Sequence, residues 1–333
     1  RRYDVTYCSI TIRTIWDRSK RISKMERIVE REVSMKILSF GSLNIDYVYK
    51  VSHFVKKGET LSAEELNVYT GGKGLNQSIA LCKSGISVYH AGRVGRTNGD
   101  MLLKMLEDVG VNTDFVSIVE EETGHAIIQR NLAGDNCILL YGGANIGIEK
   151  PWIDELSFHF EAGDYLLLQN EISNLPYIME KAIDAGVHII LNPSPMDQQV
   201  LDCPIKQVDY IILNEIEAAE ICGLVRKIKD EQLARKLAES FPNTKVILTL
   251  GEKGALYLEK GNIIRQESFH VPVVDTTAAG DTFTGYFFGS ILSGMKPETA
   301  LQRAAKAAAI AVTKKGAAPS IPEALEVDGF FSE

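Results

Sequence analysis

The sequence has no cysteine or histidine pairs at metal-binding spacing, no excess of basic residues and no hydrophobic run as long as a membrane span. Its five cysteines are scattered without a Cys-x-x-Cys pair, which is typical of reduced thiols in a cytoplasm. The six histidines include no His-x-x-x-His pair, so we do not expect a structural zinc site. The net charge of −8 lacks the basic footprint of a general nucleic-acid-binding protein.

What is present has the composition of an ordinary globular enzyme. With 333 residues, of which 45% are hydrophobic, the chain is long enough for one large α/β domain with an accessory piece. The segment Arg1–Ser34 differs from the rest, because it carries nine Lys and Arg against five Asp and Glu. We expect Arg1–Ser34 to be an upstream extension outside the fold, and Met35 to be the biological start. An organelle-targeting peptide is the weaker alternative, given the glutamates in this segment.

Short apolar and β-branched runs predict strands in the first half of the chain. Lys36–Gly41 is typical of a buried strand, and Tyr47–Val51 and Ala63–Thr70 alternate around a Gly-Glu-Thr turn as paired strands do. We expect this pair to form a small β layer outside the main sheet. Three later runs are expected to join that layer, namely Val116–Val119, Gly124–Asn131 and Asn136–Tyr141. The layer would therefore span approximately residues 45–70 and 115–141.

From Asp164 onward, predicted strands and helices alternate. The strands are expected at Tyr165–Gln169, His188–Asn192, Tyr210–Leu213 and Val246–Leu250, with helices at Pro176–Ala185, Glu215–Cys222 and Asp230–Ser240. This alternation predicts a mostly parallel sheet with crossover helices on its faces, and such sheets bind ligands at the carboxyl ends of their strands. Polar residues or glycines follow the expected strand ends at Asn44, Asp46, Glu171, Asn192, Asn214, Thr249 and Gly251.

The stretch Val274–Gly285 is the centre of the predicted chemistry. A short apolar run leads into Ala278-Ala279-Gly280, an order that predicts a strand, a tight turn and a helix start. The first amide groups of a helix have no internal partner and carry partial positive charge, so this turn could bind a phosphate. Asp281 would repel a phosphate, but it suits a general base that takes the proton of an attacking hydroxyl. The alternative is that Asp281 only caps the helix beside a glycine turn, and the local sequence favours the two interpretations equally.

Two other glycine clusters are candidates for ligand contacts. Gly71–Gly74 is neither a Walker loop nor the dinucleotide fingerprint. Its glycines permit close approach of the backbone, and Lys73 and Asn76 offer donors to a polyhydroxylated ligand. Thr249–Gly254 suits the flank of a nucleotide. The alternatives are a helix-opening turn for the first cluster and a hairpin turn for the second.

Asn214 follows a predicted strand directly, and Glu217 lies one turn into the helix that begins there. We expect Asn214 to contact a nucleotide or to cap the helix. Glu217 could hold a Mg²⁺ ion, either directly or through water. A solvated glutamate is commoner in a first helical turn, so the alternative stays open.

Taken in order, these motifs resemble a known enzyme family. The segments that carry the resemblance are Asn44-x-Asp46, Gly71-Gly72-Lys73-Gly74-x-Asn76-Gln77, Asn214-x-x-Glu217, Asp275-Thr276-Thr277-Ala278-Ala279-Gly280-Asp281-Thr282-Phe283 and Ala311-Val312-Thr313-Lys314-Lys315-Gly316-Ala317-x-Pro319-Ser320. They are similar to the PfkB family of carbohydrate kinases, and most closely to the ribokinases within it. The resemblance runs from near Met35 to the C-terminus. Leu75, Ser78 and Thr284 depart from the usual residues near the sugar, which bears on the identity of that sugar.

The resemblance implies a ribokinase-like three-layer α/β/α fold, with a mostly parallel central sheet and a small β-sheet lid that often forms a dimer contact. The implied activity is transfer of the γ-phosphoryl group of ATP to the primary hydroxyl of D-ribose, giving ribose 5-phosphate. Other PfkB substrates, such as fructose, a deoxy-keto acid or a nucleoside, are alternatives. A regulator that has lost turnover is disfavoured by the intact Asp281 and Glu217. A nicotinamide dehydrogenase is least favoured, because no glycine-rich turn follows the first strand.

The resemblance also implies roles for individual residues. Asp281 matches the catalytic base, and the amide groups from Ala278 through Ala279 and Gly280 to residue 281 match the anion hole. The sugar hydroxyls would contact Asn44, Asp46, Gly72, Lys73, Asn76, Glu171 and Asp281. The nucleotide would contact Asn214, Thr249, Gly251, Gly254 and Gly280, with Glu217 near Mg²⁺. The loop site that takes K⁺ in ribokinases matches Asp275, Thr277, Ala311, Lys314, Gly316 and Ser320.

Overall fold

The computed structural model describes residues 37–157, 159–224 and 228–330. The predicted extension Arg1–Ser34 and the predicted start Met35 lie outside these residues. The remaining chain, Lys36–Glu333, is one unit by its internal contacts. Within the described ranges, no helix is both long enough and apolar enough to span a membrane.

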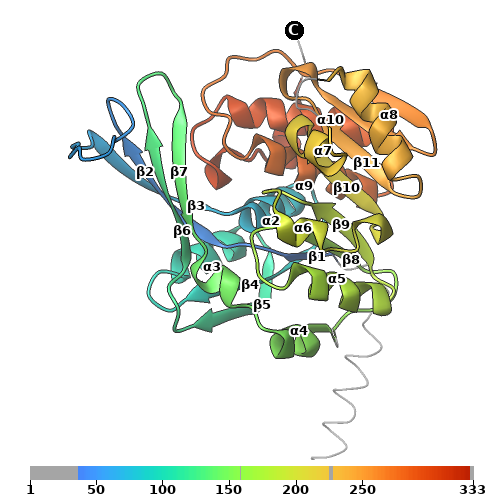
Figure 1. The fold of residues 1–333 in the computed structure, drawn as a ribbon, viewed down its shortest axis with the longest axis horizontal. Coiled ribbons are helices and arrows are strands. Elements are labelled where there is room, and N and C mark those ends of the chain that lie inside the picture. Colours follow the sequence, from blue (N-terminus) through green and yellow to red (C-terminus); the bar gives the residue numbers. More distant parts are fainter. Residues whose placement is uncertain (1–36, 158, 225–227, 331–333) are drawn as a thin grey trace, which may run out of the picture. The chain divides into compact units, whose positions relative to one another are not determined.

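A nine-stranded sheet forms the centre of this unit (Figure 1). Its strand order is β13-β12-β11-β10-β9-β8-β1-β4-β5, and the pairing is parallel from β11 to β5 and antiparallel where β12 and β13 extend one edge. The strands are β1 (Ile37–Phe40), β4 (Val88–Gly95), β5 (Asn112–Val119), β8 (Tyr165–Gln169), β9 (His188–Asn192), β10 (Tyr210–Asn214), β11 (Lys245–Thr249), β12 (Ala255–Glu259) and β13 (Asn262–Gln266).

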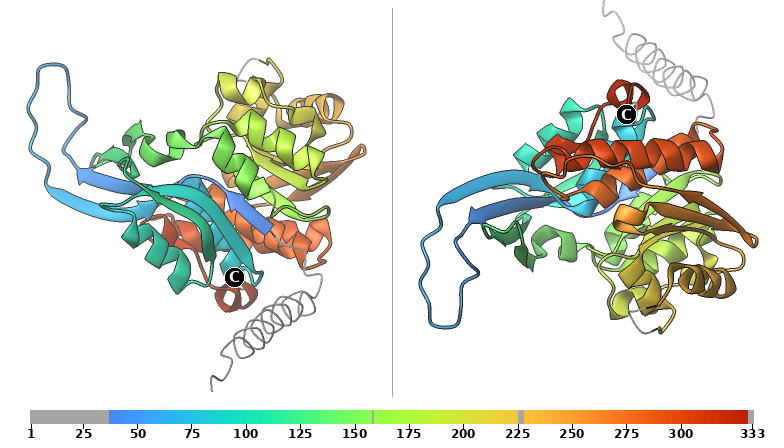
Figure 2. Two further views of the ribbon diagram at one scale, coloured as in Figure 1. Left: turned by 90° about the horizontal axis from the view of Figure 1, so that it is seen from below. Right: turned by 90° about the horizontal axis from the view of Figure 1, so that it is seen from above.

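Helices cover both faces of this sheet, which gives three layers (Figure 2). Successive residues of a strand point to opposite faces, so Ile37 and Leu38 of β1 belong to two different cores. The core that contains Ile37 is shared by α2 (Lys73–Lys83), α3 (Asp100–Asp108), α9 (Ala279–Leu292), α10 (Pro297–Val312) and α11 (Ala324–Asp328). The core that contains Leu38 is shared by α4 (Lys150–Ser157), α5 (Leu175–Asp184), α7 (Glu215–Ile221) and α8 (Asp230–Ser240), with α6 (Gln198–Leu201) beside α5. The three-layer architecture predicted from the sequence is confirmed.

The chain reverses its direction of winding at β1, which lies between β4 and β8. Such a reversal leaves a crevice at the carboxyl ends of the adjacent strands. The chain leaves β1 through Gly41, where a Cβ would lie 2.0 Å from Gln169 Oε1 and 2.8 Å from the Cα of Gly74. Only glycine therefore allows the segment after β1, the end of β8 and the start of α2 to meet at this crevice.

A second sheet of four strands, which we call the lid, projects beyond the helices (Figure 1). Its strands, in the order β3-β2-β6-β7, are β3 (Glu65–Gly71), β2 (Asn44–Lys50), β6 (Gly124–Arg130) and β7 (Asn136–Tyr141). β2 pairs antiparallel with β3 and parallel with β6, and β6 and β7 form a hairpin. Every residue of β7 is exposed. The paired strands and the hairpin predicted for the small β layer are confirmed.

Two predictions about strands are wrong. Val116–Val119 lies in β5 of the large sheet and not in the lid, because α3 connects β4 to β5 and brings them together as parallel neighbours. The strand expected to lead into the turn at residue 278 does not form, and residues 267–275 have no regular secondary structure. The amides of Val274 and Asp275 donate instead to the Val312 carbonyl, at 2.8 and 3.1 Å, so this segment is held against the end of α10.

Candidate active site

A cavity of about 260 Å³ lies at the carboxyl ends of β9, β10 and β11, beside the start of α9. Each of these strands contributes its last residue, namely Asn192, Asn214 and Thr249. The start of α9 contributes the turn 278–281, and Thr284 lies one helical turn further on. Of the polar residues predicted to meet at the carboxyl edge of the sheet, this cavity brings together Asn192, Asn214, Thr249 and Asp281.

The turn before α9 has a left-handed backbone. Ala278 has a φ of 59°, a region that costs an alanine roughly 1 kcal/mol, and it directly precedes the first helical residue, Ala279. The side chain of Asp275 holds the preceding residues, because its Oδ1 accepts the Thr277 amide at 3.0 Å and the Thr277 hydroxyl at 2.6 Å. Contacts behind the turn therefore stabilise a conformation that alanine does not favour.

The helix start exposes backbone amides to the cavity. A Cβ at Gly280 would meet no heavy atom within 4 Å, so the main chain there faces open space. The Ala279 amide donates to the Thr276 carbonyl at 3.3 Å, and it is therefore partly satisfied. The amides of Gly280 and Asp281 belong to the first helical turn and are the best placed to receive an anion.

Two amide side chains of α2 hold the carboxylate of Asp281, which is 9% exposed. Its Oδ2 accepts from Asn76 Nδ2 at 3.0 Å and its Oδ1 accepts from Gln77 Nε2 at 2.9 Å. Gln77 is fixed in turn, because its Oε1 accepts from Gln169 Nε2 of β8 at 2.8 Å. The sequence assigned no role to Gln77 or Gln169. A chain of buried amides thus sets the orientation of Asp281.

One ammonium group lies among four carboxylates beside the cavity. Burial and the nearby carboxylates of Glu171 and Asp281 raise the pKa of Asp46 to about 6, although Lys73 opposes this shift. Burial alone would lower the pKa of Lys73, but Asp281, Glu171, Glu217 and Asp46 outweigh it and raise that pKa above its ordinary value. Lys73 therefore stays charged, and its carboxylate neighbours depend on it for neutralisation.

The glycine motif lets α2 begin directly against the end of β1. Gly72 has a φ of 93°, and a Cβ there would lie 2.9 Å from the Ser42 carbonyl oxygen, so both conformation and space require glycine. Oε2 of Glu171 accepts the Lys73 amide at 3.1 Å and also accepts the Ser42 hydroxyl. Glu171 therefore binds the first turn of α2 with one oxygen and leaves Oε1 for a ligand.

Asn44 begins β2 and is buried. Its orientation is set by Asn145, whose Nδ2 donates to Asn44 Oδ1 at 2.8 Å and whose Oδ1 accepts the Leu43 amide at 3.0 Å. The nitrogen of the Asn44 side chain is therefore the group left for a ligand. The sequence did not predict this role of Asn145. The signal that could have found it is the pair Gly142-Gly143 just before it, which is similar to Gly71-Gly72 before Lys73.

Asn214 and Glu217 form a helix cap and also line the cavity. Asn214 Oδ1 accepts the amides of Ile216 and Glu217, both at 2.9 Å, and the Asn214 amide donates to Glu217 Oε2 at 3.0 Å. The capping alternative for Asn214 is therefore correct, and Glu217 keeps Oε1 for a further partner. On the next strand, the Thr249 hydroxyl donates to the Leu213 carbonyl at 3.3 Å.

Gly251 and Gly254 follow Thr249 but do not line the cavity. Both have positive φ, 57° and 91°, in the turn that leads to β12. A Cβ at Gly254 would lie 2.0 Å from the Gln266 carbonyl oxygen, so this glycine is needed for the hairpin. Gly251 meets no such neighbour. The hairpin alternative thus describes the second half of this turn.

The residues predicted for K⁺ lie behind the α9 turn. Asp275 Oδ2 accepts the Gly316 amide at 3.3 Å, and the Ala311 carbonyl accepts the Lys314 amide at 3.0 Å. The Lys314 ammonium lies 2.7 Å from Glu326, so this residue could offer a cation only its carbonyl oxygen. The other two predicted members are Thr277, bonded to Asp275, and Ser320, whose hydroxyl donates to the Ala317 carbonyl.

A second cavity, of about 310 Å³, lies beside the lid and contains none of the predicted site residues. It is lined by Ile45, Tyr47 and Tyr49, which alternate along β2 with Asn44 and Asp46 and therefore point to the other face of the lid. Of these two cavities, the one beside α9 is therefore the candidate for the predicted chemistry.

Residues 34–324 match the family described as "pfkB family carbohydrate kinase". The chain belongs to this family. A ribokinase from Haemophilus influenzae is 36% identical over 298 residues, which is 87% of this chain and 96% of the relative. A deoxyribokinase from Salmonella typhi is 30% identical over 304 residues, 90% of this chain and 99% of the relative. The structure of Arabidopsis thaliana ribokinase complexed with ribose and ATP superimposes with a TM-score of 0.76 at 30% identity. The match covers 88% of this chain and 97% of the Arabidopsis chain.

Membership of the PfkB family confirms the resemblance, the ribokinase-like fold and the carbohydrate kinase class that the sequence indicates. The roles of single residues stay predictions. The structure brings Asp281, Asn76, Asp46 and Lys73 together beside the α9 turn. The predicted residues that do not line the cavity beside α9 are Asn44, Asp46, Gly72, Asn76, Glu171, Gly251, Gly254 and those of the K⁺ loop.

Proposed function

We propose that this PfkB kinase transfers the γ-phosphoryl group of ATP to the primary hydroxyl of D-ribose, giving ribose 5-phosphate. The observation that supports this most is the place of Asp281, whose buried carboxylate lies in the wall of the same cavity as the bare amides of α9. Ribose as the sugar rests on the relatives named for it and on the Arabidopsis complex with ribose and ATP.

In the proposed reaction, Asp281 accepts the proton of the primary hydroxyl while that oxygen forms a bond to the γ-phosphorus and the bond to ADP breaks. The amides of Gly280 and residue 281 donate to the phosphoryl oxygens, where charge develops. Asn76 and Gln77 hold the carboxylate in one orientation before substrate binds, so the base needs no reorganisation. The proton then passes from the carboxyl group to solvent.

The sugar would bind between α2 and the lid. Asn44 offers a nitrogen donor, Lys73 offers its ammonium, and Asp46 and Glu171 offer carboxylate oxygens. The bare backbone at Gly72 lets the sugar approach the main chain closely. Closure of the lid over the sugar would exclude water and suppress hydrolysis of ATP.

The nucleotide side suits a Mg²⁺ ion held mainly by phosphate oxygens. Within the described ranges, no group of three or more His, Cys, Asp or Glu side chains could hold a metal ion. Glu217 fits a direct or water-mediated contact, because it lines the cavity and has one oxygen left beyond its cap. When bound, Mg²⁺ would neutralise charge on the transferring phosphoryl group. Glu217→Gln should raise the Mg²⁺ concentration needed for half-maximal activity, and an unchanged requirement would contradict this contact.

The loop behind the turn suits a monovalent cation such as K⁺. Its donors would be the carbonyl oxygens of Asp275, Thr277, Ala311, Lys314 and Gly316 with the hydroxyl of Ser320, a set of oxygens without nitrogen or sulfur. A cation there would stabilise the anion hole from behind without contacting substrate. We expect higher activity in K⁺ than in Na⁺ buffers, and equal activity in the two would contradict the site.

The lid supports a proposed homodimer. Ile138, Leu139 and Leu140 of β7 are 60%, 68% and 47% exposed, and this strand forms one edge of the lid. A second lid placed along this strand would cover the edge and bury part of this apolar surface. Sedimentation should give a dimer for the native chain and a monomer for Leu139→Asp. A native monomer at micromolar concentration would contradict this assembly.

The sugar assignment is tested by kcat/KM across a panel of D-ribose, 2-deoxy-D-ribose, D-fructose, a 2-keto-3-deoxy sugar acid and a nucleoside. We expect ribose to exceed the others by about tenfold or more, because buried polar groups left unpaired by an analogue are costly. A preference for 2-deoxyribose would instead favour the second candidate, a deoxyribokinase, to which the Salmonella relative points. Failure to release ADP with any sugar would contradict the kinase proposal and favour a regulator.

The proposed location is the cytoplasm. Cys82, Cys137, Cys203 and Cys222 are free thiols, which agrees with a reducing compartment. Fractionation of cells that express the full chain tests this location.

A further inference from the structure

One arginine of the lid reaches the loop that leads into α9. Arg130 is the last residue of β6, and its Nη1 donates to Asp275 Oδ2 at 3.0 Å. Its Nη2 donates to the Val274 carbonyl at 3.3 Å. The side chains are 31% and 9% exposed, whereas the surface pair Arg96–Glu120 is 69% and 81% exposed. The Arg130–Asp275 pair is therefore more shielded from solvent than that surface pair, and it connects the lid to the body of the protein.

Asp275 carries the effect of Arg130 to the phosphoryl-binding turn. Asp275 uses both carboxylate oxygens, because Oδ1 accepts from Thr277 and Oδ2 accepts from Arg130 Nη1 and from the Gly316 amide. It bonds Thr277, and the next residue is Ala278 with its left-handed backbone. A shift of Asp275 would therefore reach the amides at the start of α9.

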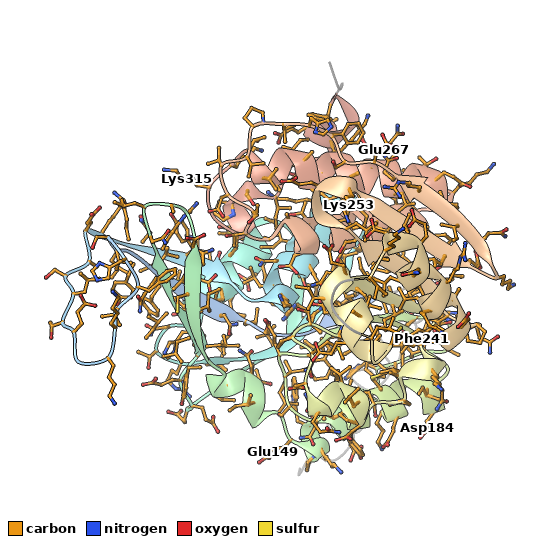
Figure 3. All side chains as sticks on the ribbon, turned by 45° about the horizontal axis from the view of Figure 1, so that its top comes forward. Glu149, Asp184, Phe241, Lys253, Glu267 and Lys315 are labelled. Atoms are coloured by element: carbon orange, nitrogen blue, oxygen red, sulfur yellow. The ribbon has the colours of Figure 1, made fainter. Side chains whose placement is uncertain are left out.

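A second lid strand contacts the same loop. The ring of Tyr69, from β3, lies 3.4 Å from the position of a Cβ on Gly316, whose amide bonds Asp275. Figure 3 shows Lys315, the neighbour of Gly316, on the side of the body that faces the lid. β3 and β6 lie on either side of β2, so the lid touches this loop through two of its strands. Movement of the lid away from the body would withdraw both contacts together.

We propose that Arg130 is a positioning residue that couples the lid to the phosphoryl-binding turn. With the lid in the observed position, the guanidinium fixes Asp275, and Asp275 fixes Thr277 and Ala278. The inference rests on the proposed function, in which this turn receives the phosphoryl group. Neither Arg130 nor Asp275 is among the residues proposed to contact the sugar or the nucleotide, so the coupling should act on turnover and not on substrate affinity. The anion hole is thus complete only when the lid lies against the body.

The test compares Arg130→Gln with a matched lid variant, Lys50→Gln. Lys50 lies opposite Arg130 in the β2–β6 register, but it pairs at 2.8 Å with Glu64, the residue before β3, and not with the body. We expect Arg130→Gln to lower kcat by about 10- to 100-fold, with the sugar KM changed by less than about threefold. Arg130→Lys keeps the charge and should recover most of the turnover. Lys50→Gln should match the native enzyme.

Hydrogen exchange provides a readout that needs no substrate. Residues 274–281 should exchange faster in unliganded Arg130→Gln than in the native chain or in Lys50→Gln, because the loop has lost its charged anchor. Faster exchange in a protein that phosphorylates no sugar would uphold the coupling and refute the proposed function. Unchanged exchange would overturn the coupling, even if turnover fell or the sugar KM rose. Arg130→Met replaces Arg130→Gln if the glutamine variant does not fold.

Discussion

The two sides of the candidate active site are built from different groups. On the sugar side, buried side chains hold one another, as Gln169 bonds Gln77 and Gln77 bonds Asp281. On the nucleotide side, the wall consists of strand ends and backbone, and Gly280 faces open space. The first side is fixed by side-chain hydrogen bonds before any ligand binds, whereas the second is a surface of donors around an open cavity.

The difference follows from what each side must do. Proton transfer needs the base and the hydroxyl at a distance fixed to a fraction of an ångström, so Asp281 must not rotate. A phosphate chain needs positive potential and several donors, which the backbone at helix and strand ends supplies without a particular side chain. Side-chain changes should therefore alter turnover or stability on the sugar side and have smaller effects on the nucleotide side.

The largest effect is expected for Asp281→Asn. Asparagine is nearly isosteric but cannot accept the proton of the hydroxyl, so kcat should fall by about 10²- to 10⁴-fold. The variant should fold and still bind sugar, because the packing around α9 is kept. Steady-state kinetics measures the first effect, and calorimetric titration with ribose measures the second. Turnover near the native value would show that Asp281 is not the base.

The sequence predicts the glycines and strand-end residues of this site better than it predicts the buried amides that orient Asp281. Glycines and polar residues after strands can be recognised from the sequence, because positive φ and close backbone approach require a particular residue type, as at Gly72. Gln169 carries no such signal. It acts only because β8 lies beside β1, and 92 residues separate it from Gln77.

The fold shows the same limit. The alternation after Asp164 was sufficient to predict the parallel sheet, because each apolar strand there is buried on both faces by its helices. Val116–Val119 has strand character too, but its composition does not say which sheet it joins. The helix α3 decides this by returning the chain beside β4. Local preference thus predicts a strand, and connectivity selects its partner.

The next largest effect is expected at Gly74, with Gly280 as the matched comparison. A Cβ at Gly74 would lie 2.5 Å from backbone atoms of Gly41 and Ser42, so Gly74→Ala must displace α2. We expect the free energy of unfolding to fall by about 1–3 kcal/mol in urea denaturation, together with lost activity. Gly280→Ala has open space around it and should keep native stability while raising the KM for ATP.

Equal stabilities of the two alanine variants would remove the contrast between a packed sugar side and an open nucleotide side. A destabilised Gly280→Ala would do the same, because it would show that the α9 turn is packed as tightly as the start of α2.

A smaller effect should follow pH through Asp46. Its pKa is raised to about 6 by burial and by Glu171 and Asp281, so the folded protein binds this proton more tightly than the unfolded chain. The stabilisation by protonation is complete below the ordinary value of 3.8 and is lost as the pH rises through about 6. The carboxylate should also be the form that binds sugar, so the KM for ribose should rise by up to about tenfold per pH unit below 6.

Asp46→Asn is the control for this pH dependence. The free energy of unfolding of this variant, measured against that of the native enzyme, should be higher at pH 8 than at pH 4. Its weak ribose affinity should no longer depend on pH in this range. A native KM that stays constant from pH 7.5 to 5 would show that the ionised Asp46 is not needed for sugar binding.

The smallest effect is expected for Thr249→Val, on the nucleotide side. Valine keeps the shape of the side chain and removes only a hydroxyl whose hydrogen bond to the Leu213 carbonyl is long, at 3.3 Å. We expect the KM for ATP to change by about threefold or less and kcat to stay native, because the lost hydrogen bond is internal to the protein and a weak one contributes only about 0.5 kcal/mol, a factor of about two. A rise of the ATP KM by about tenfold or more would mean that a side chain, and not the backbone, dominates nucleotide binding here.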